Sequence, residues 1–152
     1  MLYKSELRTP IGTLGLLANK EQLLKLTFKG LKDITEEAQE DKSRFKLIFR
    51  ELNEYFAGKR KQFSVDYLID TSPFATRVYK EMIKIPYGST LSYSELAKKS
   101  GSKLAYRAVG TACRKNPLPL IIPCHRVTAV NGLGGFGGGL DTKRFLLNLE
   151  TN

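Results

Sequence analysis

The pattern of the sequence changes near residue 70, and this change limits the chain to a two-part α+β fold. Short apolar runs separated by turn residues dominate residues 1–70, which is typical of β-strands. Apolar residues three and four positions apart dominate residues 71–152, which is typical of helices. The chain has 152 residues, enough for one domain or two very small ones. We therefore predict an N-terminal domain over residues 1–70 and a C-terminal domain over residues 71–152.

The charge balance changes at the same place and is the main reason for placing the boundary there. Of the formal net charge of +10, residues 1–70 contribute +2 and residues 71–152 contribute +8. A one-sided basic surface attracts polyanions, first among them nucleic acid. The alternative interpretation is that the positive charge only keeps the protein in solution.

Composition excludes several classes of protein. A hydrophobic content of 41% supports a packed core rather than disorder. Two cysteines cannot form the disulfide framework of a secreted domain, and with one histidine they are too few for a closed zinc site. The first ten residues are charged and have no apolar stretch, so we expect no leader segment. No apolar run in the sequence approaches the roughly 20 residues that span a bilayer. We expect a cytoplasmic monomer with no metal, no cofactor and no membrane association.

The N-terminal part is predicted as a β-meander followed by a helix. Strands are expected at residues 2–9, 12–19 and 23–30, with turn residues between them. Residues 36–57 are charged and carry one apolar stripe at helical spacing, formed by Phe45, Ile48, Phe49, Leu52 and Phe56. A connector with one more short strand is expected up to residue 70.

The C-terminal part contains the pattern of a helix-turn-helix. Thr71 or Ser72 can cap a first helix whose first turn contains Pro73. Ser92 and Glu95 have capping-box spacing and open a short helix that ends at Lys99. After a turn at Gly101, Ser102 can cap a second helix over residues 103–115. Small residues dominate this second helix, so it can lie close to another surface, either a neighbouring helix or DNA. Arg107 among the alanines favours DNA.

The last third of the chain holds the reactive residues. Residues 118–123 are an apolar run, predicted as a buried strand. The triplet Cys124–His125–Arg126 follows and includes the only histidine. Residues 131–140 hold six of the thirteen glycines and form a loop that lets backbone approach a ligand. A final helix over 141–150 is expected to turn Phe145, Leu146 and Leu149 inward.

Three interpretations of Cys124 are open from the residues alone. A metal site is disfavoured, because one histidine and two cysteines are too few ligands. A cysteine–histidine dyad requires the imidazole within reach of the sulfur. In an extended segment adjacent side chains point to opposite faces, so such a dyad would need a bridging water. A buried structural cysteine is the third interpretation.

The order of the motifs "SYSELA", "RAVG", "NPLPLII" and "PCHRV" followed by a glycine-rich loop closely resembles the alkylguanine-DNA alkyltransferase family. The resemblance covers residues 71–150. It implies a ribonuclease-H-like N-terminal domain and a winged-helix-like, mostly helical C-terminal domain. It also implies transfer of an alkyl group, mainly methyl, from O6 of a guanine flipped out of double-stranded DNA. The protein would be consumed in this reaction and would need no cofactor.

The resemblance assigns roles residue by residue. Cys124 would be the nucleophile and His125 would take its proton through a water. Glu150 would hold the imidazole, and Asn116 would brace the turn before the nucleophile. The helix-turn-helix would bind the minor groove, with DNA contacts from Tyr93, Ser94, Ser102 and Arg107. The base pocket would be formed by Tyr93, Pro119, Val127, Phe136 and Gly137.

Two positions depart from the family pattern. Some members have a tyrosine at Phe136 and a serine at Gly137. Without that hydroxyl, stabilisation of the leaving guanine would come from backbone N–H groups of the glycine loop. The alternative function is a non-catalytic alkyltransferase-like damage sensor or a basic helix-turn-helix regulator, although such sensors usually lack the cysteine that is present here.

Overall fold

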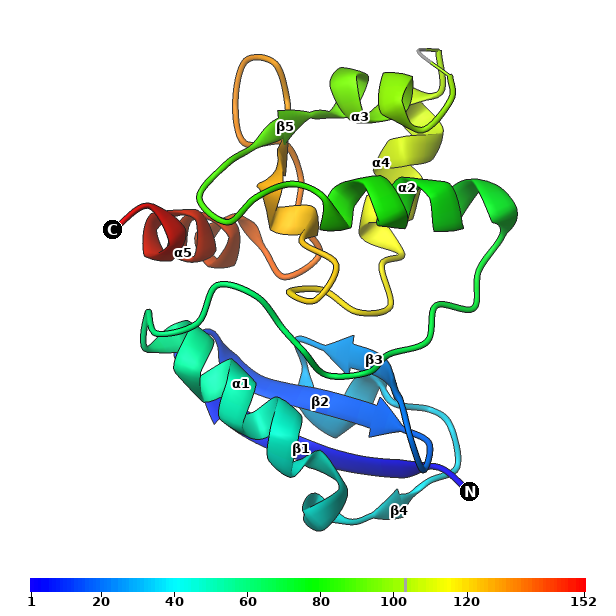
Figure 1. Ribbon diagram of the computed structural model, residues 1–152, viewed down its shortest axis with the longest axis vertical. Helices are drawn as coiled ribbons and strands as arrows, with labels where there is room; N and C mark the ends of the chain where they lie inside the picture. Colours follow the sequence, from blue (N-terminus) through cyan, green and yellow to red (C-terminus); the bar gives the residue numbers. More distant parts are fainter. Residues whose placement is uncertain (103) are drawn as a thin grey trace. The chain divides into compact units, whose positions relative to one another are not determined.

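The computed structural model describes residues 1–102 and 104–152 and divides into two compact units, Met1–Ile69 and Asp70–Asn152 (Figure 1). The boundary falls between a strand-rich and a helix-rich stretch, where the sequence changes pattern. Within the described ranges, no helix combines the length and hydrophobicity that a bilayer span requires.

The first unit contains a four-stranded sheet in the order β3-β2-β1-β4. The strands are β1 (Tyr3–Thr9), β2 (Gly12–Ala18), β3 (Leu23–Thr27) and β4 (Gln39–Glu40). The first three pair antiparallel, which confirms the predicted meander, and β4 adds to β1 in parallel. Gly15 is required in the central strand because a Cβ there would collide with the backbone of Gly30. β4 has only two residues, so it is too short to show the alternation of apolar and polar residues by which a strand can be predicted.

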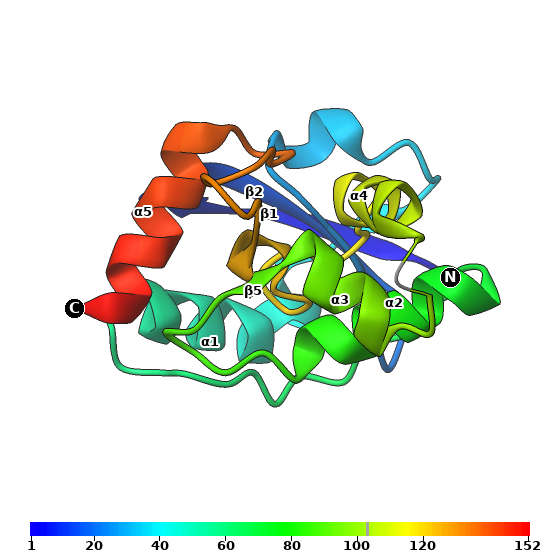
Figure 2. The same cartoon turned by 90° about the horizontal axis from the view of Figure 1, so that it is seen from above.

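Helix α1 (Lys46–Phe56) covers one face of this sheet (Figures 1 and 2). The predicted helix over 36–57 is wrong at its start, because β4 and a 3₁₀ turn, η2 (Lys42–Phe45), occupy those residues. A second 3₁₀ turn, η1 (Gly30–Asp33), follows β3. The buried face of α1 consists of Ile48, Phe49, Glu51, Leu52 and Tyr55. The strand predicted in the connector is reduced to one bridge between Tyr67 and Leu23.

The second unit packs four helices around a short parallel pairing of β5 (Leu91–Ser92) with β6 (Val127–Thr128). The helices are α2 (Pro73–Ile83), α3 (Tyr93–Lys99), α4 (Tyr106–Arg114) and α5 (Leu140–Thr151). The predicted caps of the first two are confirmed: Ser72 accepts a hydrogen bond from the Ala75 N–H at 3.2 Å, and Ser92 from the Glu95 N–H at 3.1 Å. Helices α3 and α4 form the expected helix-turn-helix.

Three predictions for this unit need correction. Helix α4 starts at Tyr106 after Ala105 with no side-chain cap, so Ser102 does not cap it; Lys103, the predicted first residue, lies outside the described residues. Residues 118–123 form tight turns instead of a strand, with Leu120 in the left-handed region at φ +76°. Phe145 is 39% exposed rather than inward-facing.

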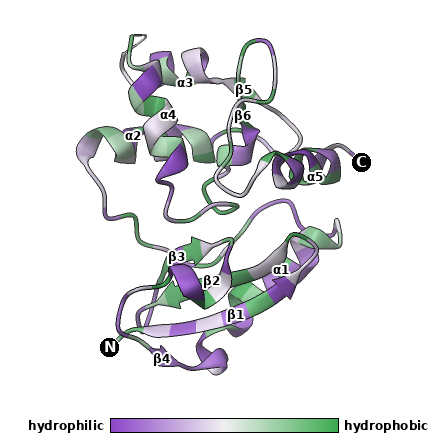
Figure 3. Ribbon diagram, turned by 180° about the vertical axis from the view of Figure 1, so that it is seen from behind, coloured by the Kyte–Doolittle hydropathy of each residue, from purple (hydrophilic) through white to green (hydrophobic). Residues whose placement is uncertain are grey.

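A 3₁₀ turn, η3 (Cys124–Arg126), lies between α5 on one side and α2, α3 and α4 on the other (Figures 1 and 2). Hydrophilic and hydrophobic residues both occur along α1 and α5, as expected for helices with one buried face (Figure 3). The core of this unit is formed by Val78, Met82, Leu96, Val109, Leu118, Ile122, Val127 and Leu146, each at 0% exposure. The reactive triplet is therefore built into the core and not onto a surface loop.

Candidate functional site

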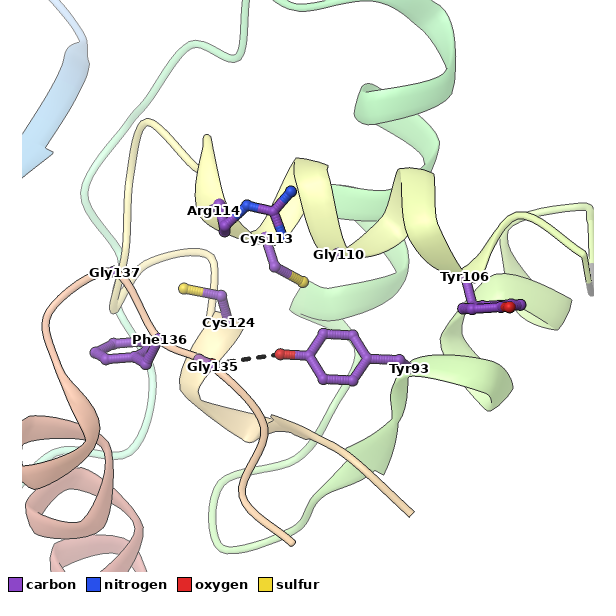
Figure 4. Close-up of a pocket in the computed structure, with 9 residues that line it drawn as sticks. All are labelled: Tyr93, Tyr106, Gly110, Cys113, Arg114, Cys124, Gly135, Phe136 and Gly137. Atoms are coloured by element: carbon purple, nitrogen blue, oxygen red, sulfur yellow. Dashed lines mark hydrogen bonds between the residues drawn. The ribbon is translucent and has the colours of Figure 1, made fainter. Parts of the chain in front are cut away.

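A cavity of about 380 Å³ opens beside Cys124 in the second unit (Figure 4). Helix α4 forms one wall, because its cavity-lining residues follow one helical face. Tyr93 at the start of α3 lies opposite, and the glycine loop closes another side. The full lining is Tyr93, Tyr106, Gly110, Cys113, Arg114, Cys124, Gly135, Phe136 and Gly137.

Cys124 is the first residue of η3 and is 6% exposed. Asn116 braces the turn before it: its side-chain amide donates to the Ile122 carbonyl at 2.8 Å and accepts from the Leu118 N–H at 2.9 Å. The Cys124 N–H donates to the same Ile122 carbonyl at 2.8 Å. Burial raises the pKa of the Cys124 thiol to about 11, against the lowering effects of Asn116 and Lys143. At neutral pH the resting group is therefore a thiol, and it needs a base to react.

A buried network lies next to this thiol. The Nε2 atom of His125 is 2.6 Å from a carboxylate oxygen of Glu150. Arg126 donates from Nε and Nη2 to the two oxygens of the same carboxylate at 2.8 and 3.0 Å. The Gly88 N–H also donates to it, at 3.3 Å. Glu150 is therefore a buried, ion-paired carboxylate and not a surface charge, and it fixes the orientation of the imidazole.

The arrangement makes the second ring nitrogen of His125 the proton acceptor. Because a carboxylate only accepts hydrogen bonds, Nε2 carries the hydrogen and Nδ1 carries the lone pair. Nδ1 is buried and has no hydrogen-bond partner among the described residues, so Cys124 Sγ is not hydrogen-bonded to it. Burial lowers the pKa of His125 below its ordinary value of 6.5, although Glu150 acts in the opposite direction. The ring is therefore neutral at pH 7 and able to accept a proton.

We expect the single histidine to titrate below pH 6.5 in the folded protein. The unfolded chain binds this proton first as the pH falls, so the free energy of unfolding should decrease progressively below about pH 6.5. An NMR pH titration reads this directly, because His125 is the chain's only imidazole. A midpoint at or above 6.5 would contradict the buried, neutral ring described here.

The wall of the cavity opposite α4 is held together by hydrogen bonds from side chains to backbone carbonyls. The Tyr93 hydroxyl donates to the Gly135 carbonyl at 3.3 Å. Lys143 of α5 is fully buried and donates to the same carbonyl at 3.1 Å and to the Val127 carbonyl at 2.7 Å. Gly134 has φ +73°, and a Cβ there would lie 2.7 Å from the Tyr93 ring. The loop can therefore pass this close to Tyr93 only because residue 134 is a glycine.

The structure brings together some of the predicted site residues and not others. Cys124, Tyr93, Phe136 and Gly137 line one cavity, and Asn116, His125 and Glu150 support it. Pro119 and Val127, predicted for the base pocket, are not among the residues that line the cavity. Both are buried, and the Val127 carbonyl accepts a hydrogen bond from Lys143. Ser94, Ser102 and Arg107 lie outside the cavity lining, on the helix-turn-helix.

Sequence reasoning missed Cys113, Arg114 and Lys143. Helical spacing could have found Cys113 and Arg114. Cys113 and Arg114 are seven and eight residues after Tyr106, on the cavity face of α4. Lys143 shares the buried face of α5 with Leu146 and Glu150. Within the described residues, no group of three or more histidine, cysteine or acidic side chains is placed to hold a metal ion.

The chain is similar to known proteins over nearly its whole length. Residues 2–67 match the ribonuclease-like domain and residues 73–152 the DNA binding domain of 6-O-methylguanine DNA methyltransferase. A methylated-DNA–protein-cysteine methyltransferase of Methanosarcina barkeri is 42% identical, covering 99% of this chain and 98% of its own length. One of Metallosphaera sedula is 41% identical, covering 93% and 88%.

A solved structure of Mycobacterium tuberculosis OGT in complex with DNA superimposes with a TM-score of 0.92 at 38% identity, covering 98% of this chain and 92% of that one. The fold agreement therefore extends across both units. The chain belongs to the 6-O-methylguanine DNA methyltransferase family.

Proposed function

We propose that this protein repairs DNA by moving the methyl group of O6-methylguanine onto Cys124 in a reaction that each molecule performs once. The observation that carries the proposal is a thiol at the edge of a cavity, next to a buried imidazole that a carboxylate orients. Family membership and the DNA complex of the mycobacterial relative support the same conclusion.

The reaction proceeds by a proton transfer and a displacement at carbon. The proton of Cys124 passes through a bridging water to Nδ1 of His125, and Glu150 stabilises the resulting imidazolium. The thiolate sulfur then forms a bond to the methyl carbon as the bond from that carbon to O6 breaks. The guanine takes up a proton and leaves restored, while the protein keeps an S-methyl thioether. Water does not readily hydrolyse a thioether, so the site is not regenerated.

The leaving guanine would be stabilised by the glycine loop. Phe136 lines the cavity with a ring that has no hydroxyl to donate. Gly135 and Gly137 on either side bring backbone close to the cavity. Backbone N–H groups of this loop would therefore supply the hydrogen bonds to O6 as charge develops there.

The helix-turn-helix α3–α4 would hold the DNA. Residues 71–152 carry a charge of +8, which suits a phosphate backbone. Arg107 is exposed in the first turn of α4, where it would fill the gap left by the flipped nucleotide, and Ser94 and Ser102 would contact the backbone. We further propose a cytoplasmic location, because a nucleophilic thiol needs a reducing compartment and Cys113 and Cys124 are both free.

Replacing Arg107 by alanine should slow repair of duplex DNA by at least about tenfold, because base extrusion costs a few kcal/mol that the arginine would offset. Reaction with free O6-benzylguanine, which needs no extrusion, should keep its rate. The measurement is the rate of protein alkylation on the two substrates, with Arg144→Ala, an exposed arginine of α5, as the control. Equal losses on both substrates would assign Arg107 to the fold.

The proposed function is tested by counting repaired lesions. Duplex DNA containing O6-methylguanine is added in excess, and restored guanine is measured over time. Repair should stop when one lesion per protein molecule has been removed. Continued turnover would contradict a single-use thiol. Binding without any repair would show instead that the protein is a damage sensor.

A further inference from the structure

We propose that Tyr106 is a substrate-binding residue at the mouth of the cavity: its ring packs against the deoxyribose of the flipped nucleotide, and its hydroxyl donates a hydrogen bond to a phosphate beside that nucleotide. The inference deepens the proposed function and rests on it for the substrate, a nucleotide turned out of DNA. The reaction described above uses the sulfur, the imidazole and the glycine loop, but it leaves the outer end of the cavity without a task.

Helix α4 forms a long wall of the cavity, and its two ends differ. The helix contributes Tyr106, Gly110, Cys113 and Arg114 to the lining, in that order along one helical face. Because the helix rises 1.5 Å per residue, Tyr106 and Cys113 lie about 10 Å apart along its axis. Cys124 lies beside the Cys113 end, and Tyr106 lies at the opposite end (Figure 4). The reacting sulfur and Tyr106 are therefore at the two ends of the wall.

Tyr106 stands at the open end of this wall. It is 52% exposed, whereas Cys124 is 6% exposed. The Tyr106 hydroxyl has no hydrogen-bond partner within residues 1–102 and 104–152. One turn further along, Gly110 leaves the wall bare, because a Cβ there would have only the end of the Arg114 side chain within 4 Å, at 3.7 Å. The cavity is thus open along α4 between Tyr106 and the thiols.

A nucleotide fits this layout in one direction only. The methyl group on O6 must reach Cys124, so the base takes the inner end and the deoxyribose with its phosphates takes the mouth. A tyrosine offers an apolar ring face to the sugar and a hydroxyl that can donate to a phosphate oxygen. Arg107 does not line the cavity, because neighbouring side chains on a helix point about 100° apart. The two residues would therefore hold different parts of the DNA.

The test compares three substrates: O6-methylguanine in duplex DNA, O6-methylguanine in single-stranded DNA, and free O6-benzylguanine. Tyr106→Ala should slow alkylation of the protein by the two DNA substrates by similar factors, each larger than about tenfold, because both contain the sugar and the phosphate. The rate with the free base, which has neither group, should be kept. Arg107→Ala should instead slow mainly the duplex reaction, because a single strand has no base pair to break.

The variant Tyr106→Phe isolates the hydroxyl. It should slow the reaction with single-stranded DNA by about tenfold, as expected for a hydrogen bond to a charged group. Replacing the phosphate on the 5′ or on the 3′ side of the lesion by an uncharged methylphosphonate should, for one of the two, reduce this difference to about threefold. The reason is that a charge-assisted hydrogen bond is about twice as strong as a neutral one. Tyr3→Phe, which removes a hydroxyl from β1 of the first unit, is the control and should change no rate.

Three results would overturn the inference. Equal losses on all three substrates would assign Tyr106 to the fold, a loss confined to the duplex would assign it to base extrusion, and a Tyr106→Phe protein that reacts like the parent would remove the phosphate contact. Binding of the lesion-containing single strand, measured by fluorescence anisotropy in a Cys124→Ser background, should weaken in Tyr106→Ala and gives the same contrast without methyl transfer. Failure of the proposed function would appear separately, as a parent protein that binds the strand but gains no methyl group.

Discussion

Replacing Cys124 by serine is expected to abolish methyl transfer, with a loss on the order of 10³-fold or more, because a hydroxyl is a far weaker nucleophile than a thiolate. The substitution removes one sulfur from a side chain that is 6% exposed and should leave the fold intact. DNA binding, measured by fluorescence anisotropy with a lesion-containing duplex, should be retained because the helix-turn-helix is unchanged.

The matched control for this experiment is Cys113→Ser, since Cys113 lines the same cavity. That variant keeps the proposed nucleophile and should still become methylated. Burial raises the pKa of Cys113 to about 12, and it has no imidazole relay beside it. Transfer that survives Cys124→Ser but not Cys113→Ser would move the nucleophile to α4 and refute the assignment.

Replacing Glu150 by glutamine is expected to damage both stability and reaction. The carboxylate is the shared partner of His125 and Arg126 inside the core. Removing its charge leaves a buried guanidinium without its counter-ion, and breaking a buried pair in this way costs about 3–5 kcal/mol of unfolding free energy. The loss of imidazole orientation should slow methyl transfer by about 10²–10⁴-fold.

Urea unfolding followed by circular dichroism measures the first effect, and single-turnover transfer at a temperature where the variant is folded measures the second. Asp141→Asn is the control, because it breaks an ion pair of the same helix that is exposed to solvent. It should change neither quantity measurably. A Glu150→Gln protein with the stability and rate of the parent would show that the buried network has no role.

Local sequence signals predicted the parts of the fold that depend on neighbouring residues. The capping serines Ser72 and Ser92 start α2 and α3 where expected, because a side-chain cap acts within three residues. The start of α4 was predicted wrongly, because Ser102 offers a cap that the chain does not use. The turns at 118–123 were also missed, because their apolar side chains resemble a strand while Asn116 and a left-handed Leu120 bend the backbone.

The site was predictable where motif residues are adjacent in sequence and not where the fold brings distant residues together. The motif around Cys124 predicted a thiol at the cavity and an imidazole beside it, and the structure places both residues there. Lys143 escaped notice because a lysine in a helix is usually solvated, and only the packing of α5 shows that this one is buried. Val127 was expected in the base pocket, but its carbonyl is occupied by that same lysine.

Methyl transfer to Cys124 is tested by the mass of the protein and of its peptides after reaction with duplex DNA containing O6-methylguanine. We expect the intact mass to rise by one methyl group and the group to be found on the peptide containing Cys124. An unchanged mass in the presence of bound lesion, or a methyl group on any other residue, would contradict it.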